Sequence, residues 1–387
     1  MKIPAATRQT TGYFYAFVIL GAVISALGPT IDGLASNLGQ TATALSFLFS
    51  FRAVGYLTGS LGGGYLYEKI RGNRALGFIL LFLALILVLT PTFQTTIPLI
   101  FALILTGISC GATDVGSNTL LAYTHKKRVG PYLNAMYLFA GLGSFAAPLF
   151  LGSVSLEWGY AGLSLLILPA AALLLTTPSP QIQKSSENQT ETILHRDLLI
   201  VFALLSFFYI GMEVSFSGWI YTFFLKRFPE NPESGYLITS LFWAGITAGR
   251  LLAIPLSTRV KEAHLIRAFI WGGISSLAAM LLFPSAVWSV WVGTAGMGFS
   301  LSAIFPTTFS FVQKIHPFPP RQNGVVWASG STGSIILPFL VGRQIGISGP
   351  MSMPVILAVC WVLALILLSY LLRSAKKIDL QQREVSV

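Results

Sequence analysis

The sequence predicts an all-α membrane protein with twelve transmembrane helices in two pseudo-symmetric six-helix bundles. Composition gives the first indication, because 54% of the 387 residues are hydrophobic and only 10% are charged. A soluble protein carries about 25% charged residues. Twelve apolar segments long enough to cross a bilayer give the second indication. A repeat of glycine and proline positions between the two halves of the chain gives the third.

The apolar segments follow one another along almost the whole chain. They cover roughly residues 12–35, 43–67, 74–93, 97–123, 131–153, 157–177, 198–224, 235–258, 264–283, 286–313, 323–346 and 352–372. The first is too long for a signal peptide and lacks a small-residue cleavage site, so we expect it to be retained. The longest polar break separates six segments from six. We therefore expect an N-terminal bundle over residues 1–177, a cytoplasmic linker over 178–197, a C-terminal bundle over 198–373 and a cytoplasmic tail over 374–387.

The fifth and eleventh segments share an order of residues. The fifth contains Asn134, Gly141, Gly143, Pro148 and Gly152, and the eleventh contains Asn323, Gly330, Gly333, Pro338 and Gly342. The second and eighth segments each contain two glycines spaced by four. Both pairs are six segments apart, which is typical of two parallel repeats with a substrate site between them near the middle of the membrane.

Lysine and arginine in the loops predict the orientation. With the N-terminus in the cytoplasm, the cytoplasmic side has nineteen of these residues and the opposite side has three. The positive-inside rule then places both termini on the cytoplasmic side. We expect the membrane to be the plasma membrane, or the inner membrane if the protein is bacterial. The basic residues form short clusters between apolar segments, so the net charge of +11 does not indicate nucleic-acid binding.

Charged residues inside the expected helices are the main functional candidates, because an unpaired charge in hydrocarbon costs about 3 kcal/mol or more. They are Asp32, Arg52, Asp114, Glu213 and Arg250. We expect the opposite charges to form two pairs or loose networks, Asp114 with Arg52 and Glu213 with Arg250. At least one of these acids is expected to titrate during transport. The alternative is static pairing that only fixes helix packing.

The stretch from Gly107 to Asn118 organises the first half. Asp114 and Asn118 are four residues apart and so share one helix face. Small residues around them allow neighbouring helices to approach closely. The arrangement indicates part of a ligand or proton path, and the alternative is a buried polar pair that only joins helices.

A second polar face lies in the seventh segment, where Tyr209, Glu213 and Ser217 are spaced by four. Carboxylates, amides, hydroxyls and an aromatic platform are what a sugar requires. The expected substrate-binding residues are Asn118, Asp114, Asn134, Tyr137, Tyr209, Glu213, Ser217, Trp219, Trp243, Asn323 and Trp327. For each aromatic residue the alternative is lipid contact or core packing.

The loop expected between the second and third segments carries an acid and several bases. We interpret it as a cytoplasmic gate motif formed by Gly64, Glu68, Lys69, Arg71, Gly72 and Arg74. Such charges can bridge helix ends and latch the cytoplasmic side. The alternative is ordinary positive-inside charge.

This loop, the twelve segments and the six-plus-six repeat resemble the major facilitator superfamily. Three stretches, 51–64, 107–118 and 209–219, look like the fucose–galactose–glucose permease branch and its sodium-glucose and MFSD4-like relatives. In that branch an acid four residues before an asparagine on the fourth helix binds substrate and proton. The resemblance implies this role for Asp114 and Asn118.

We therefore expect a secondary active transporter that works by alternating access. Its expected activity is cation-coupled uptake of a monosaccharide or similar small polar solute, with H⁺ or else Na⁺ as coupling ion. We expect a monomer in the lipid bilayer, with no other cofactor, no metal site and no enzymatic activity. The alternatives are an exporter of amphipathic compounds and a non-transporting sensor or scaffold of the same fold.

Overall fold

The computed structural model describes residues 4–70, 72–180, 196–315 and 320–385. Within these ranges the chain forms twelve long α-helices and two short 3₁₀ helices, η1 (Thr90–Thr92) and η2 (Lys126–Arg128). The first half contains α1 (Ala5–Asn37), α2 (Phe47–Lys69), α3 (Gly72–Leu89), α4 (Thr96–His125), α5 (Val129–Gly152) and α6 (Leu156–Thr176). The second half contains α7 (Arg196–Arg227), α8 (Ser234–Arg259), α9 (Glu262–Leu282), α10 (Val287–Ile315), α11 (Pro320–Ser348) and α12 (Ser352–Val385).

Hydrocarbon offers no hydrogen-bond partner to backbone N–H and C=O groups, and an α-helix pairs these groups with each other. Segments that cross the membrane therefore form long helices. Within the described residues, eleven of the twelve are long and apolar enough to cross a membrane. The remaining one, α2, is less apolar because it carries Arg52 and many glycine, serine, threonine and tyrosine residues. These residues belong to the site described below.

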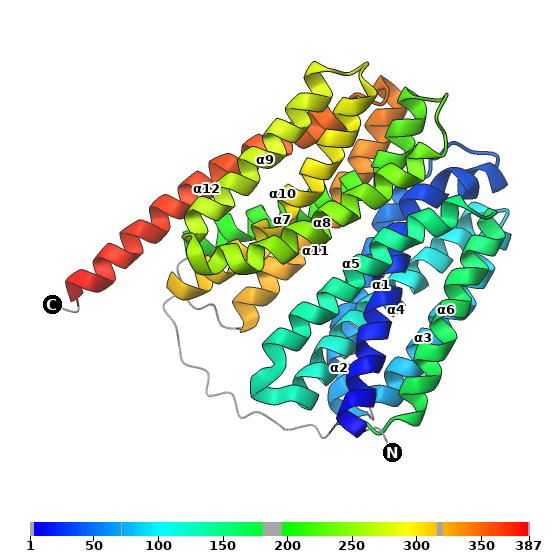
Figure 1. Ribbon diagram of the computed structural model, residues 1–387, viewed down its shortest axis with the longest axis horizontal. Helices are drawn as coiled ribbons and strands as arrows, with labels where there is room; N and C mark the ends of the chain where they lie inside the picture. Colours follow the sequence, from blue (N-terminus) through cyan, green and yellow to red (C-terminus); the bar gives the residue numbers. More distant parts are fainter. Residues whose placement is uncertain (1–3, 71, 181–195, 316–319, 386–387) are drawn as a thin grey trace.

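Helix contacts repeat between the two halves. In the first half α1 packs on α5, α2 on α4 and α3 on α6, and in the second half α7 packs on α11, α8 on α10 and α9 on α12. Each pair in the second half is the first-half pair shifted by six helices. Figure 1 shows the two bundles side by side, α1–α6 in blue to green and α7–α12 in green to red. The predicted fold class of two pseudo-symmetric six-helix bundles is confirmed.

The bundles touch through α1 with α7, α2 with α11, and α5 with α8. Several close contacts between the bundles lie at one end of the molecule. There the Ser50 hydroxyl donates a 2.6 Å hydrogen bond to the carbonyl of Ile335, and Gly28 packs against the backbone of Ser217 and Gly218. We call this the closed end. The opposite end, which carries the start of α1 and the turn between α2 and α3, is the terminal end (Figure 1).

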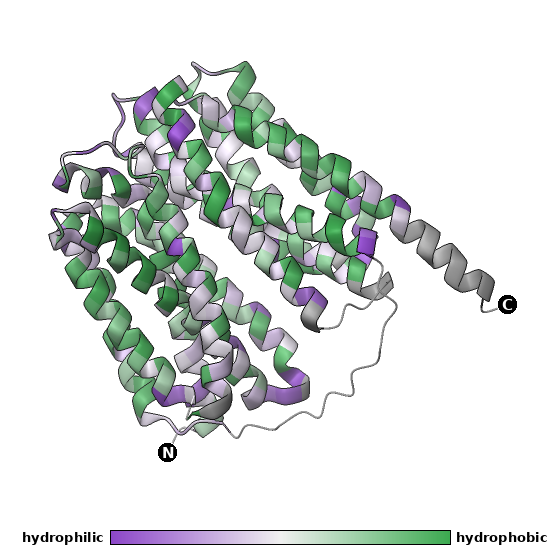
Figure 2. Ribbon diagram, turned by 180° about the vertical axis from the view of Figure 1, so that it is seen from behind, coloured by the Kyte–Doolittle hydropathy of each residue, from purple (hydrophilic) through white to green (hydrophobic). Residues whose placement is uncertain are grey.

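Strongly hydrophilic residues gather mainly toward the helix ends, and hydrophobic residues predominate along the helices (Figure 2). Many large apolar side chains are exposed there, such as Leu61, Ile97 and Trp158 at 68% to 74%. Exposed apolar surface on this scale is typical of a face in contact with lipid.

Two boundaries differ from those predicted. The segment expected as a loop from Gly64 to Arg74 is mostly helical, because α2 continues to Lys69 and α3 begins at Gly72. The last helix continues from the expected span into the expected tail and ends at Val385. In both places the hydropathy falls where the helix leaves the apolar zone, while the helical backbone continues.

Candidate functional site

Asp114 lies on α4 with both carboxylate oxygens occupied by hydrogen-bond donors. The Tyr56 hydroxyl on α2 donates to Oδ2. The Asn118 amide donates to Oδ1 at 2.8 Å and to the Asp114 main-chain carbonyl at 3.0 Å. The predicted sharing of one helix face by Asp114 and Asn118 is therefore seen as a direct contact.

Glycines fix the register of α2 against α4. A Cβ atom at Gly107 would lie 2.1 Å from the carbonyl oxygen of Arg52, and one at Gly111 would lie 2.1 Å from the carbonyl oxygen of Tyr56. The two backbones are thus in direct contact, as small residues at a helix interface allow. Tyr56 is level with Gly111, and Asp114 follows within one turn.

This register explains why one expected ion pair is wrong. Arg52 is level with Gly107, seven residues before Asp114, or about 10 Å along the helix axis. Its guanidinium donates instead a 3.0 Å hydrogen bond to the carbonyl of Ile24 on α1. Among the described residues Arg52 joins α2 to α1, and Asp114 is held by a tyrosine and an amide.

The second expected grouping is brought together. Glu213 on α7 interacts electrostatically with Arg250 on α8. The Tyr209 hydroxyl, one turn before Glu213 on the same helix, interacts with both the carboxylate and the guanidinium. Each bundle therefore places a carboxylate beside a tyrosine, and the second bundle adds a cation.

Tyr137 on α5 connects the two groups. Its hydroxyl accepts a 3.4 Å hydrogen bond from the Asn118 amide, and it interacts electrostatically with both Asp114 and Arg250. Polar groups thus run from one bundle to the other. We call this set the central polar cluster, and it comprises Tyr56, Asp114, Asn118, Tyr137, Tyr209, Glu213 and Arg250.

Aromatic rings extend the cluster within the second bundle. The ring of Phe305 on α10 stacks on Tyr209 with centroids 5.5 Å apart. Trp327 on α11 meets Phe305 edge to face at 5.0 Å and is 52% exposed. An exposed indole that reaches Tyr209 through Phe305 is the kind of side chain expected to stack against the C–H face of a sugar ring.

Trp219 does not belong to this surface. It is fully buried, its indole N–H donates a 2.7 Å hydrogen bond to the Pro338 carbonyl, and its ring packs against Phe49 at 5.2 Å. Ser217 also lies at the closed end, where its backbone contacts Gly28. In this conformation both residues join the bundles, so their expected place in the substrate site is corrected.

The other predicted binding residues lie apart from the cluster or at its edge. Trp243 is 6% exposed and packs on Phe242. Its indole N–H has no hydrogen-bond partner in the described part of the chain. Asn134 is exposed about one turn before Tyr137 on α5, toward the terminal end, and Asn323 lies in the first turn of α11.

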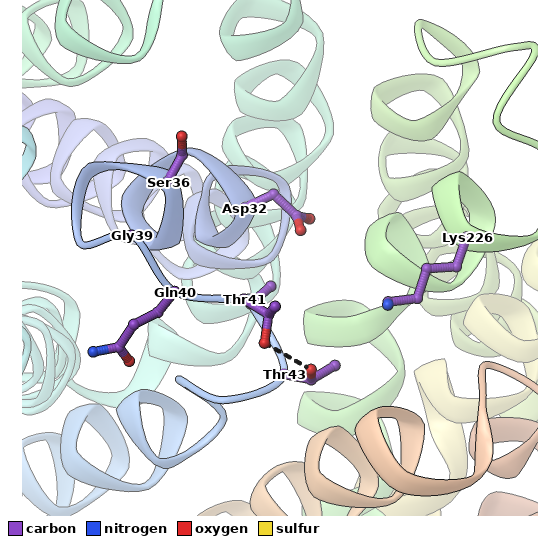
Figure 3. Close-up of a pocket in the computed structure, with 8 residues that line it drawn as sticks. Asp32, Ser36, Gly39, Gln40, Thr41, Thr43 and Lys226 are labelled. Carbon is purple, nitrogen blue, oxygen red and sulfur yellow. Dashed lines mark hydrogen bonds between the residues drawn. The ribbon is translucent and has the colours of Figure 1, made fainter.

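Asp32 is likewise separate from Asp114. Its carboxylate accepts a 3.0 Å hydrogen bond from the Thr222 hydroxyl of α7, and it faces Lys226 across a pocket (Figure 3). The pocket has a volume of about 370 Å³. Its lining residues are Asp32, Ser36, Gly39, Gln40, Thr41, Ala42, Thr43 and Lys226. Asp32 therefore belongs to the closed end.

The expected gate motif is only partly within the described structure. Gly64 lies on α2, and Gly72 and Arg74 begin α3, where Gly72 packs against Leu120 of α4. Arg71 lies outside the described residues, as do the side chains of Glu68 and Lys69.

Sequence reasoning missed Tyr56 and Phe305. The first was signalled by its place one turn after Arg52 and within the same glycine-rich segment. Phe305 had no such signal, because one phenylalanine among the 28 in the chain is distinguished only by its stacking on Tyr209.

Comparisons with known proteins place the chain among transporters. The model of the family described as Major Facilitator Superfamily matches residues 13–338. The chain is similar to sodium-dependent glucose transporter 1 of Xenopus laevis, 28% identical over 355 residues that cover 82% of this chain and 72% of that protein. It is 23% identical to major facilitator superfamily domain-containing protein 4A of Danio rerio, covering 89% and 84%. A solved nucleoside transporter shares the fold with a TM-score of 0.78 at 14% identity, covering 95% of this chain and 100% of that chain.

Proposed function

Because the chain belongs to the major facilitator superfamily, as its sequence resemblance implied, we propose that it takes up a monosaccharide or similar small polar solute together with a proton. It is a multi-pass integral membrane transporter and not an enzyme. Its similarity to sodium-dependent glucose transporters and to the 4A-type proteins agrees with the predicted branch. The substrate, the coupling ion and the direction of transport are the parts that we propose.

The observation that carries the proposal is the central polar cluster between the bundles. It combines two carboxylates, an amide, three tyrosine hydroxyls and a guanidinium with the exposed ring of Trp327. Sugar hydroxyls both donate and accept hydrogen bonds, and the cluster offers both kinds of partner. An exporter of amphipathic compounds would instead need a wide, mainly apolar cavity. The polar groups of the cluster therefore support a sugar.

The contacts of Asp114 support a proton as the coupling ion. Both of its carboxylate oxygens already accept hydrogen bonds, from Tyr56 and Asn118. A sodium ion would need several such oxygens directed at itself, and Asn118 presents its N–H there. A proton needs only one lone pair of the carboxylate. A sodium requirement, as named for the glucose transporters, is the second candidate.

We propose further that both termini are cytoplasmic, as loop charge predicts, so that the closed end faces outward. The cluster is then closed to the outside in this conformation. Alternating access would open the closed end and shut the terminal end around the cluster. A monomer contains both bundles and is sufficient for this cycle.

Transport assays test the proposal. Purified protein in liposomes would be supplied with radiolabelled glucose, galactose, fucose or xylose, with an imposed proton gradient, a sodium gradient or neither. Accumulation of one sugar under the proton gradient is expected. Accumulation under the sodium gradient alone would make sodium, and not the proton, the coupling ion. No sugar movement under any gradient would favour the exporter of amphipathic compounds.

A further inference from the structure

Among the described residues Tyr56 is the one member of the central polar cluster that donates a hydrogen bond to Asp114 from another helix of the same bundle. We propose that Tyr56 is a positioning residue that sets the pH range over which Asp114 takes up and releases the coupling proton. The inference rests on the proposed function, because it requires Asp114 to be the coupling acid.

Two hydrogen bonds act on the carboxylate that would bind the proton. The Tyr56 hydroxyl has a single hydrogen, which it donates to Oδ2 of Asp114. Asn118 donates to Oδ1. Each oxygen keeps a second lone pair, so an incoming proton can bind while both donors stay in place. Both donors stabilise the ionised carboxylate, and the pH at which the proton binds therefore depends on them.

Asn118 also donates an N–H to the Tyr137 hydroxyl. Tyr137 interacts electrostatically with Asp114 and with Arg250 of the other bundle. A change in the charge of Asp114 therefore acts on a group that also interacts with the second bundle.

The Tyr56–Asp114 contact is expected to persist through the transport cycle. Contacts of Gly55 and Gly59 on α2 and of Gly107 and Gly111 on α4 lock the two helices backbone to backbone. Both helices belong to one bundle, so rocking of the bundles leaves their register unchanged. Arg250 belongs to the other bundle, and its distance from Tyr137 changes with the rocking. The hydrogen bond from Tyr56 to Asp114 is thus expected to stay constant through the cycle, whereas the interaction of Arg250 with Tyr137 changes.

Other titratable groups around Asp114 are few in the described residues. On α2 Tyr67 packs against Gly116 of α4 with no hydrogen-bond partner among the described residues, and Arg52 is hydrogen bonded to Ile24 of α1. On α4 Cys110 interacts electrostatically with Asp114, and on α5 Tyr137 does so. From α1 and α3 no charged side chain of the described residues is found to interact with it. Tyr56 is the one of these that donates a hydrogen bond to the carboxylate.

The test compares two tyrosines of α2. Tyr56→Phe removes the donor to Asp114. Tyr67→Phe is the matched control, because Tyr67 packs against Gly116 of α4 and its hydroxyl has no partner in the described residues. Both variants would be placed in liposomes, and glucose counterflow and proton-driven glucose uptake would be measured from pH 5 to 9.

A hydrogen bond to the ionised carboxylate favours the ionised form. Its loss makes Asp114 hold the proton more tightly, so Tyr56→Phe should move the pH midpoint of uptake upward by about one unit. Tyr67→Phe should leave the midpoint in place. Should Tyr56→Phe fail to fold, 3-fluorotyrosine at position 56 keeps the shape of the residue and strengthens the donor. It should move the midpoint downward.

An unchanged midpoint in folded Tyr56→Phe, or in the fluorotyrosine protein, would overturn the inference. An equal shift in Tyr67→Phe would do so too, since it would assign the effect to packing. Either result could occur while Asp114→Asn still uncouples transport, and the proposed function would then stand. If Asp114→Asn keeps gradient-driven uptake, the proposed function and this inference fail together.

Discussion

The Thr222 hydroxyl donates a 3.0 Å hydrogen bond to the carboxylate of Asp32, and this bond joins the first helix of one bundle to the first helix of the other. It lies at the closed end beside the pocket that also contains Lys226. Close to it, Gly342 packs against Trp219 and against Ser46, which immediately precedes α2. The closed end is therefore held by a small number of specific contacts, each of which can be removed singly.

Thr222→Val should favour opening of the closed end. The change keeps the shape of the side chain and removes a hydrogen bond to a charged group, a contribution of about 1.5–3 kcal/mol. Ser46 is 2% exposed, so Ser46→Cys, with Cys110 and Cys360 replaced by alanine, gives a reporter of opening. The reporter should react at least tenfold faster with a membrane-impermeant thiol reagent when Thr222→Val is added.

Thr239→Val is the matched control for that measurement. Among the described residues the Thr239 hydroxyl bonds only to the Gly235 carbonyl of its own helix, so its removal should leave the reporter as slow as before. Equal reporter rates with and without Thr222→Val would show that the bond contributes nothing to closure.

Glycines of α2 should differ sharply in their tolerance of alanine. A Cβ atom at Gly59 would lie 2.0 Å from the Ile108 carbonyl oxygen, whereas one at Gly62 meets nothing within 4 Å. Gly59→Ala should destabilise the protein by about 1–3 kcal/mol through overpacking and lower its melting temperature by several degrees. Gly62→Ala should be neutral or slightly stabilising, because alanine favours the helix by about 1 kcal/mol.

Thermal unfolding of the two detergent-purified variants checks this directly. Equal melting temperatures would mean that α2 and α4 do not meet at these glycines. The register that separates Arg52 from Asp114 would then be wrong as well.

Two tryptophans predicted to bind substrate should behave differently. Trp327 is exposed beside the central polar cluster, so Trp327→Ala should weaken sugar binding about tenfold or more through loss of ring stacking, roughly 1.4 kcal/mol. Trp219 is buried at the closed end, so Trp219→Phe should alter the rate of opening and leave equilibrium sugar affinity from the terminal side unchanged. Equilibrium binding of radiolabelled sugar measures both, and equal losses of affinity would return Trp219 to the site.

Much of the fold could be predicted because the bilayer restricts what an apolar segment can do. Each predicted segment is part of one long helix. The repeat of glycines and prolines agrees with the packing of α1 on α5 in the first half and of α7 on α11 in the second. Helix ends were less predictable, as at Lys69 and Val385, because helical structure continues beyond the apolar zone where hydropathy falls.

The partners of the charges could be predicted only in part. Spacing along one helix is local, so the contact of Asp114 with Asn118 followed from the sequence. Contacts between helices depend on register, which backbone approach at Gly107 and Gly111 sets. In that register Tyr56, and not the expected Arg52, contacts Asp114. The prediction that Trp219 lines the substrate site failed for a similar reason. The spacing of residues along α7 does not reveal that the two bundles meet at Trp219.

The most direct test of the account is sugar accumulation by Asp114→Asn in liposomes with an imposed proton gradient, measured beside sugar counterflow in the same preparation. The substitution keeps the size of the side chain and removes the titrating group. Asp32→Asn is the control, because Asp32 is an acid in a membrane helix at the closed end. The account predicts that Asp114→Asn loses gradient-driven accumulation and retains counterflow, while Asp32→Asn still accumulates sugar. Full gradient-driven accumulation by Asp114→Asn would contradict it.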